Sequence, residues 1–142
     1  MKVKSVMTRG IEGIQAKDTI RQAAVRMKEL DVGSLAVFEG DTPTGMITDR
    51  DITIRVVGMS LDPAGLTVGE VMTKEPVTVN ENADLADAAQ VMENYKIRRL
   101  LVKNDHKQIS GIITIDDIAL RGNGKLATAV IKNVKERIGP RR

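Results

Sequence analysis

One eight-residue pattern occurs twice in this chain of 142 residues and limits how the chain can fold. The first copy is GMITDRDI at 45–52, and the second is GIITIDDI at 111–118. Both read glycine, two apolar residues, threonine, two variable residues, aspartate and isoleucine. A threonine followed three residues later by an acidic residue is typical of a helix capping box. Recurrence at a fixed spacing also indicates a duplicated structural unit.

The two octapeptides belong to longer repeats. SVMT at 5–8 returns as EVMT at 70–73, and the apolar residues that follow return in the same order. One extra residue in a polar turn of the second copy changes the offset from 65 to 66 before the octapeptide. The repeat therefore divides the chain into a first domain at 5–60, a linker at 61–68, a second domain at 69–122 and a basic C-terminal helix at 123–142.

Each repeat predicts the same series of elements. A short strand precedes a segment whose apolar residues lie at helical spacing, around 20–30 in the first repeat and 85–95 in the second. Two apolar strands joined by a polar turn follow, and a second helix begins after the threonine. This order of strand, helix, strand, strand and helix predicts an α+β fold. Because one such unit would bury little apolar surface alone, we expect the two repeats to pack sheet to sheet with pseudo-twofold symmetry.

The composition excludes several classes of function. The chain has no cysteine and one histidine, so disulfides, thiolate catalysis and thiolate-bound zinc are excluded, and we expect no metal site. Phe38 and Tyr95 are the only aromatic residues, which disfavours base stacking on single-stranded nucleic acid. No apolar stretch approaches the ~18 residues of a membrane span. The first residues lack the apolar run of a secretory signal, so we expect a cytoplasmic protein without a membrane partner.

Taken together, these features resemble a tandem pair of cystathionine-β-synthase (CBS) domains, also called a Bateman module, over about residues 6–121. The resemblance rests on the VMT segments, the two helix–strand blocks and the octapeptides, which occur twice in the same order. It implies a stand-alone regulatory protein that binds an adenosyl ligand in a cleft between the repeats. The ligand class comprises AMP, ADP, ATP, S-adenosylmethionine and NAD, with the three adenine nucleotides expected first. It also implies a homodimer of modules and no required cofactor.

The octapeptides allow two compatible interpretations. A strand that ends at Thr48 and a helix that begins after it would leave unpaired backbone N–H groups, which suit a phosphate together with the Thr48 hydroxyl. Asp51 can accept hydrogen bonds from vicinal ribose hydroxyls, and the same argument applies to Thr114 and Asp117. In the family, the matching Thr and Asp take these phosphate and ribose roles. Without a ligand, the same residues form capping boxes that stabilise a helix by ~0.5–2 kcal/mol.

Other candidate ligand residues differ between the repeats. Arg50 lies inside the first octapeptide, whereas Arg98 and Arg99 stand where the first repeat has Gly33 and Ser34. A guanidinium fork matches phosphate oxygens, so these arginines are phosphate candidates, and pairing with surface carboxylates is the alternative for Arg98 and Arg99. Adenine needs an apolar slot. The candidates by matched position, most of which also suit a core, are Ile14, Leu35, Ala36, Val79, Ile97 and Leu100.

The C-terminal segment is basic, with seven Lys or Arg and one Glu in residues 121–142. Its apolar residues share one helix face, which predicts a helix docked on the module or on its dimer mate.

No nucleophile–base pair is recognisable, so we predict a protein that is not an enzyme and that passes ligand occupancy to a partner by population shift. The alternatives are a ligand-free CBS interaction protein, or the binding of nucleic acid or another partner through the basic helix.

Overall fold

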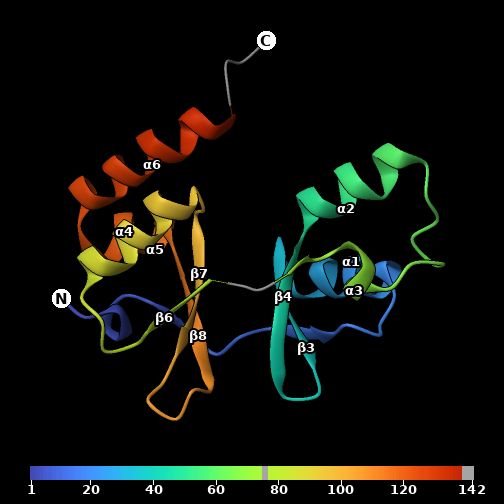
Figure 1. The fold of residues 1–142 in the computed structure, drawn as a ribbon, viewed down its shortest axis with the longest axis horizontal. Coiled ribbons are helices and arrows are strands. Elements are labelled where there is room, and N and C mark those ends of the chain that lie inside the picture. The colour runs from blue at the N-terminus through green and yellow to red at the C-terminus, as the bar shows by residue number, and fades with distance from the viewer. Residues whose placement is uncertain (75–76, 139–142) are drawn as a thin grey trace. The chain divides into compact units, whose positions relative to one another are not determined.

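The computed structural model describes residues 1–74 and 77–138, with side chains up to Val134 (Figure 1). In chain order the elements, where η marks a short 3-10 or π turn, are η1 (Val3–Ser5), β1 (Thr8–Arg9), β2 (Gly13–Gln15), α1 (Ile20–Leu30), β3 (Ser34–Glu39), β4 (Thr42–Thr48), α2 (Asp49–Arg55), η2 (Val57–Met59), α3 (Val68–Val71), β5 (Thr73–Lys74), β6 (Thr78–Asn80), α4 (Leu85–Tyr95), β7 (Arg99–Lys103), β8 (Ile109–Thr114), α5 (Ile115–Asp117), η3 (Ile118–Gly122) and α6 (Gly124–Ile138). No helix in the described ranges is both long and apolar enough to cross a membrane.

These elements form two compact units. Unit 1 comprises Met1–Ile11 with Val77–Arg142, and unit 2 comprises Glu12–Pro76. Each unit holds one mixed four-stranded sheet, with the order β1-β8-β7-β6 in unit 1 and β2-β3-β4-β5 in unit 2. The β6–β7 and β2–β3 pairs are parallel and the others antiparallel. The predicted α+β fold with two repeats is confirmed, while the packing of sheet on sheet stays a prediction.

The contact units differ from the sequence repeats because each sheet takes its edge strand from the other repeat. β1 follows the SVMT segment of the first repeat but pairs with β8, placing Arg9 opposite Gly111. β5 belongs to the EVMT segment of the second repeat but pairs with β4, placing Lys74 opposite Gly45. Figure 1 shows the blue N-terminal segment beside the strands of unit 1. The two entry segments are thus exchanged between the repeats.

This exchange explains the glycine that opens each octapeptide. A Cβ at Gly111 would overlap the carbonyl oxygen of Thr8 in β1. At Gly45 it would overlap the carbonyl oxygen of Thr73 in β5 and lie 2.7 Å from the Met72 Sδ. Glycine inside a strand often marks such a close backbone approach. The edge strands therefore require glycine at Gly45 and Gly111.

The core of each unit lies between its sheet and its helices. The helix α1 buries Ile20, Ala23 and Met27, which recur at helical spacing, against Leu35 and the other core residues of unit 2. In unit 1 the matching face of α4 joins a larger core that includes Val3, Val6 and Met7 from the N-terminal segment. Burial of these side chains fixes the exchanged segment to the second repeat.

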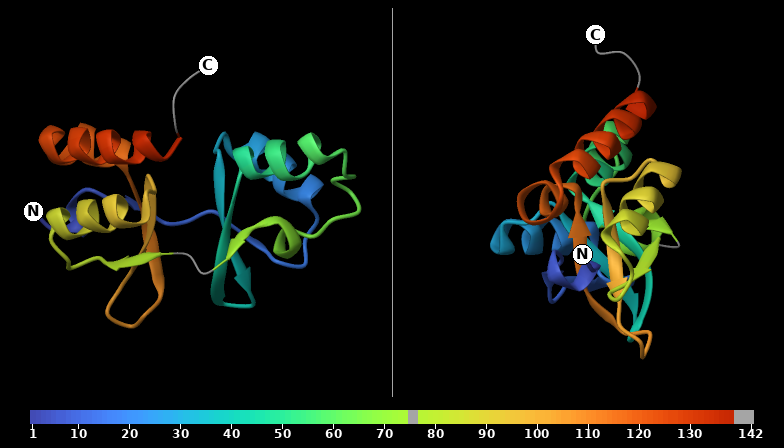
Figure 2. Two further views of the ribbon diagram at one scale, coloured as in Figure 1. Left: turned by 45° about the horizontal axis from the view of Figure 1, so that its top comes forward. Right: turned by 90° about the vertical axis from the view of Figure 1, so that its left-hand side faces the viewer.

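The expected C-terminal helix is present as α6 and docks within unit 1. Its residues Ala127, Val130 and Val134 are buried in the same core as α4. The Lys96 Nζ donates a hydrogen bond to the backbone oxygen of Asn133 in α6 at 3.1 Å. Figure 2 shows α6, in red, running along α4. The apolar face of this basic helix is therefore used within the chain.

Candidate functional site

Both octapeptides place their Thr and Asp at the junction of a strand and a helix, and both form capping boxes. In unit 2 the Asp51 N–H donates to the Thr48 Oγ1 at 3.1 Å, and the Thr48 N–H donates to the Asp51 Oδ2 at 3.0 Å. In unit 1 the Asp117 N–H donates to the Thr114 Oγ1 at 3.1 Å, and the Thr114 N–H donates to the Asp117 Oδ2 at 3.0 Å. The capping interpretation is confirmed for both copies, and it is compatible with a ligand.

The expectation of unpaired backbone N–H groups at the first octapeptide is wrong. The Asp49 N–H donates to the Gly33 oxygen at 2.9 Å, and the Arg50 N–H donates to the Asp49 Oδ1 at 2.8 Å. With the capping box, every N–H from Thr48 to Asp51 has an acceptor inside the unit, because the Asp49 side chain turns back onto its own helix start. Any phosphate held in unit 2 would therefore depend on side chains.

The second octapeptide keeps one such donor. The Ile115 N–H donates to the Arg98 oxygen at 2.9 Å, as its counterpart does in unit 2. The next residue, Asp116, is exposed, and its N–H has no acceptor among the described residues. The difference arises because Ile115 replaces the Asp49 of the first copy and its side chain has no oxygen to offer. The two sites are thus unequal in backbone donors.

The two aspartates also differ in their surroundings. Asp117 is 7% exposed, and its Oδ1 accepts a hydrogen bond from the Thr8 hydroxyl at 3.3 Å and lies 3.6 Å from the Arg121 Nη2. Asp51 is half-buried, and its Oδ1 has an Arg55 nitrogen at 3.8 Å. Only Asp117 has an exchanged-strand hydroxyl as a partner among the described residues.

Sequence reasoning missed Thr8 because it lies 109 residues from its partner. The signal that pointed to it is the repeat itself, since SVMT and EVMT end in matching threonines. The matching residue of unit 2, Thr73, is exposed and lies opposite Met46 in the β5–β4 pair. The exchange of edge strands thus brings a threonine of the first repeat to the candidate ribose-binding aspartate of the second.

The register of the sheet brings one arginine beside the Thr–Asp pair of unit 1. Arg99 lies directly opposite Thr114, and in unit 2 Ser34 lies directly opposite Thr48. Residues paired across antiparallel strands project from the same face of the sheet. In the part of the chain described with side chains, neither the Arg98 nor the Arg99 guanidinium makes an ion pair or hydrogen bond. The alternative expectation, pairing of Arg98 and Arg99 with surface carboxylates, is therefore not met within the described side chains.

The candidate adenine residues are mostly core residues. Ile14 and Leu35 belong to the core of unit 2, and Val79 and Leu100 to that of unit 1. Ile97 is partly buried against the unit 1 core. The side chains of these residues therefore lie in, or in the case of Ile97 against, the cores of their units. Ala36 is buried but lies in neither core cluster, because it alternates with Leu35 along β3 and projects from the other sheet face.

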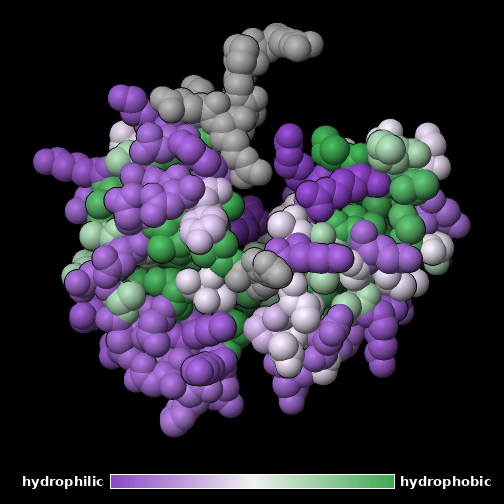
Figure 3. All heavy atoms as spheres, in the orientation of Figure 1, coloured by the Kyte–Doolittle hydropathy of each residue, from purple (hydrophilic) through white to green (hydrophobic). Residues whose placement is uncertain are grey.

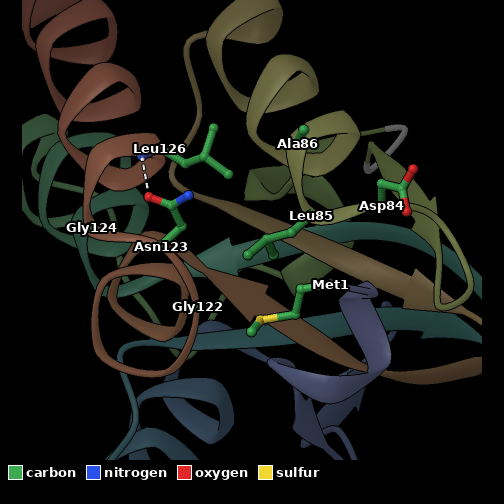
Figure 4. Close-up of a pocket in the computed structure, with 8 residues that line it drawn as sticks. All are labelled: Met1, Asp84, Leu85, Ala86, Gly122, Asn123, Gly124 and Leu126. Atoms are coloured by element: carbon green, nitrogen blue, oxygen red, sulfur yellow. Dashed lines mark hydrogen bonds between the residues drawn. The ribbon is translucent and has the colours of Figure 1, made fainter.

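A separate pocket in unit 1 shares no residue with these candidates. It has a volume of ≈ 670 Å³, and its lining consists of Met1, Asp84, Leu85, Ala86, Gly122, Asn123, Gly124 and Leu126 (Figure 4). The polar groups of Asn123 and Asp84 are engaged, since the Asn123 Oδ1 accepts from the Leu126 N–H at 3.3 Å and Asp84 pairs with Lys2 at 3.1 Å. Among the described residues, no group of three or more His, Asp or Glu side chains is placed to hold a metal ion.

Comparison with known proteins identifies the fold and the family. The family model for the CBS domain matches residues 3–58 and 68–122. The CBS domain-containing protein YhcV of Bacillus subtilis is 40% identical over 119 residues, which is 83% of both chains. A CBS domain protein from Pyrobaculum aerophilum, complexed with AMP, matches with a TM-score of 0.79 at 23% identity over 90% of this chain and 99% of its own. The hexameric CBS-CP12 protein of bloom-forming cyanobacteria matches with a TM-score of 0.76 at 29% identity over 87% of this chain and 72% of its own. The chain therefore belongs to the CBS domain family and carries two tandem CBS domains, a Bateman module.

Proposed function

We propose that this protein is a regulatory module that binds an adenosyl ligand, with AMP, ADP or ATP before S-adenosylmethionine and NAD. In this proposal Asp51 and Asp117 hold the ribose, and Thr48 and Thr114 contact the phosphate. The observation that carries the proposal is the set formed by Thr114, Asp117 and Arg99 at one end of the unit 1 sheet. The proposal gains support from the AMP complex of the Pyrobaculum protein, which shares this fold.

The chemistry of the set suits a nucleotide. The carboxylate of an aspartate can accept two hydrogen bonds from vicinal hydroxyls, and charge-assisted bonds of this kind are about twice as strong as neutral ones. The guanidinium groups of Arg98 and Arg99, which have no partner among the described side chains, supply donors for phosphate oxygens. For adenine we retain the apolar positions Ala36 in unit 2 and Ile97 in unit 1, because they are not enclosed within the core clusters.

Calorimetry and thermal unfolding with AMP, ADP, ATP, S-adenosylmethionine and NAD test this function. Ligand at one hundred times its Kd stabilises a folded protein by about 2.7 kcal/mol, which a thermal melt detects. Asp51→Ala and Asp117→Ala should each remove binding at their own site. The proposal fails if no compound binds at millimolar concentration, and the ribose assignment fails if both variants bind as tightly as the parent chain.

The expected homodimer needs an interaction surface, and an apolar patch on unit 2 is the candidate. It consists of Ile54, Val57, Met59 and Leu61, whose exposed fractions lie between 48% and 65%. Figure 3 shows hydrophobic side chains gathered over α2 and the turn that follows it. Exposed apolar patches of this kind mark interaction surfaces. We propose that a second copy of the chain covers it, giving the expected homodimer.

Sedimentation velocity tests the homodimer. Ile54→Asp places a charge in the middle of the patch at an exposed position, so it should lower the sedimentation coefficient to that of a monomer while the far-UV circular dichroism stays unchanged. Leu120→Asp is the matched control, because Leu120 occupies the same place in the second repeat and is 84% exposed. A parent chain that sediments as a monomer at 100 μM would reject the homodimer.

The basic C-terminal helix is the second candidate surface. Because α6 buries Ala127, Val130 and Val134 in the core of unit 1, only its polar side is left for a partner. Lys125 and Lys132 are exposed there. A filter-binding titration with single- and double-stranded DNA and RNA at 50 mM and 200 mM salt tests this alternative, since phosphate contacts weaken steeply with salt.

A further inference from the structure

The internal repeat gives each residue of one site a matched residue in the other, and the matched residues differ in charge. Arg98 and Arg99 of unit 1 correspond to Gly33 and Ser34 of unit 2. The sheet register supports this match, because Arg99 lies opposite Thr114 as Ser34 lies opposite Thr48. Chemical differences at these positions therefore affect which ligand each site binds.

In unit 2 a carboxylate stands at the strand entry that is basic in unit 1. A Cβ built at Gly33 would lie 3.0 Å from the Asp49 Oδ2, so this carboxylate lies beside Gly33. The residue of unit 1 that matches Asp49 is Ile115, which is buried. Counted over matched positions of the sequence, unit 1 has three arginines and two aspartates, whereas unit 2 has two arginines and two aspartates. The full set is Arg98, Arg99, Asp116, Asp117 and Arg121 in unit 1, and Asp49, Arg50, Asp51 and Arg55 in unit 2.

The basic groups also differ in availability. In unit 2 the Arg55 Nη1 donates to the Val71 oxygen at 2.9 Å, which leaves Arg50 as the arginine of that set without a partner among the described side chains. In unit 1 both Arg98 and Arg99 are without one. In unit 1 a phosphate at Thr114 would therefore meet the available Arg99 guanidinium, with Arg98 next to it in the chain, whereas in unit 2 it would meet one guanidinium together with the Asp49 carboxylate.

The two aspartates proposed to bind ribose also differ, and in this respect the unit 2 site is the more favourable one. Asp117 is 7% exposed and its Oδ1 already accepts a hydrogen bond from the Thr8 hydroxyl at 3.3 Å, so a ribose alone gains less there than at a more open carboxylate. The Asp51 Oδ1 has no hydroxyl partner among the described residues, and a ribose can bind it without displacing one. Binding in unit 1 should therefore depend more on the phosphate than binding in unit 2.

We infer that the two sites divide adenosyl ligands by charge: the Arg99–Asp117 site of unit 1, with Arg98 adjacent in the chain, selects phosphorylated ligands, and the Asp49–Asp51 site of unit 2 discriminates only weakly for phosphate. The inference rests on the proposed function, because it presumes that adenosyl compounds bind at the Thr–Asp pairs. It assigns the two copies different ligands even though they share one motif. The unit 1 site would thus respond to nucleotides, and the unit 2 site to adenosyl compounds with or without a phosphate.

The test compares AMP with adenosine by calorimetry on full-length variants that keep one site each. Asp51→Asn leaves the unit 1 site, where AMP should bind at least about tenfold more tightly than adenosine, because charge-assisted bonds to a phosphate are lost with adenosine. Exchanging the arginines for the unit 2 residues, Arg98→Gly with Arg99→Ser, should reduce this ratio to within about threefold. Both substitutions are at positions outside the core, so circular dichroism should be unchanged.

Asp117→Asn leaves the unit 2 site, where AMP and adenosine should bind within about threefold of each other. Adding Ser34→Arg to that variant should create a preference for AMP. The inference is overturned if AMP is preferred in the Asp117→Asn chain, or if the double exchange at Arg98 and Arg99 leaves the AMP preference intact. Absence of binding by both AMP and adenosine to the parent chain would also overturn the inference, whereas the proposed function fails only if ADP, ATP, S-adenosylmethionine and NAD do not bind either.

Discussion

Replacing Gly111 by alanine tests whether the exchanged edge strand dictates the glycine of the octapeptide. The added methyl group would overlap the carbonyl oxygen of Thr8, so β1 and β8 must separate locally. Complete release of β1 would expose Val6 and Met7, which are 0% and 4% exposed, at a cost of about 3–6 kcal/mol. A local shift is cheaper, and overpacking of this kind costs about 1–3 kcal/mol.

We therefore expect Gly111→Ala to lower the free energy of unfolding by about 1–3 kcal/mol. Urea unfolding followed by far-UV circular dichroism is the suitable assay, because the chain has no tryptophan and its one tyrosine, Tyr95, is 60% exposed. Gly124→Ala is the control, since nothing lies within 4 Å of its added Cβ and the substitution should be neutral or stabilise by up to about 1 kcal/mol. If Gly111→Ala unfolds at the same urea concentration as the parent chain or later, the explanation of this glycine is wrong.

Two further predictions concern stability. Thr114→Val removes the hydroxyl that accepts from the Asp117 N–H, and without any ligand it should destabilise the chain by about 0.5–2 kcal/mol in the same urea assay; an unchanged midpoint would contradict the capping role. Val130→Ala, in the buried face of α6, should cost about 1.5–3 kcal/mol, whereas Ile131→Ala, at a residue 43% exposed, should cost less than about 0.5 kcal/mol. Equal losses in the two α6 variants would show that the helix is not held through this face.

Much of the fold could be predicted from the sequence because the repeat supplied each element twice. The apolar spacing around Ile20 and Leu85 predicted the first helix of each repeat, and the structure has these helices at Ile20–Leu30 and Leu85–Tyr95. The exchange of edge strands could not be predicted, because two-residue strands such as β1 carry no periodic signal of their own. Pairing over a long sequence separation depends on packing that a local pattern does not contain.

Part of the candidate site could also be predicted from the sequence. The Thr–Asp pairs were found because helix capping and ligand binding require the same residue types at the same spacing. The side chain of Asp49 could not be placed from sequence, because its rotamer decides whether the Arg50 N–H is free or engaged. Thr8 escaped detection for a different reason, since its role depends on the strand exchange.

The exchange of edge strands also fixes the order in which the chain can complete its structure during synthesis. Unit 2 is one continuous segment, Glu12–Pro76, and all of its strands have been made before β6 begins. Unit 1 needs the first eleven residues together with β8, so β1 has no partner strand until Thr114 has left the ribosome. The first residues can meet their backbone partners at 81–85 earlier, since the Val3 N–H donates to the Ala83 oxygen, but the strand pairing of β1 must wait until most of the chain has been translated.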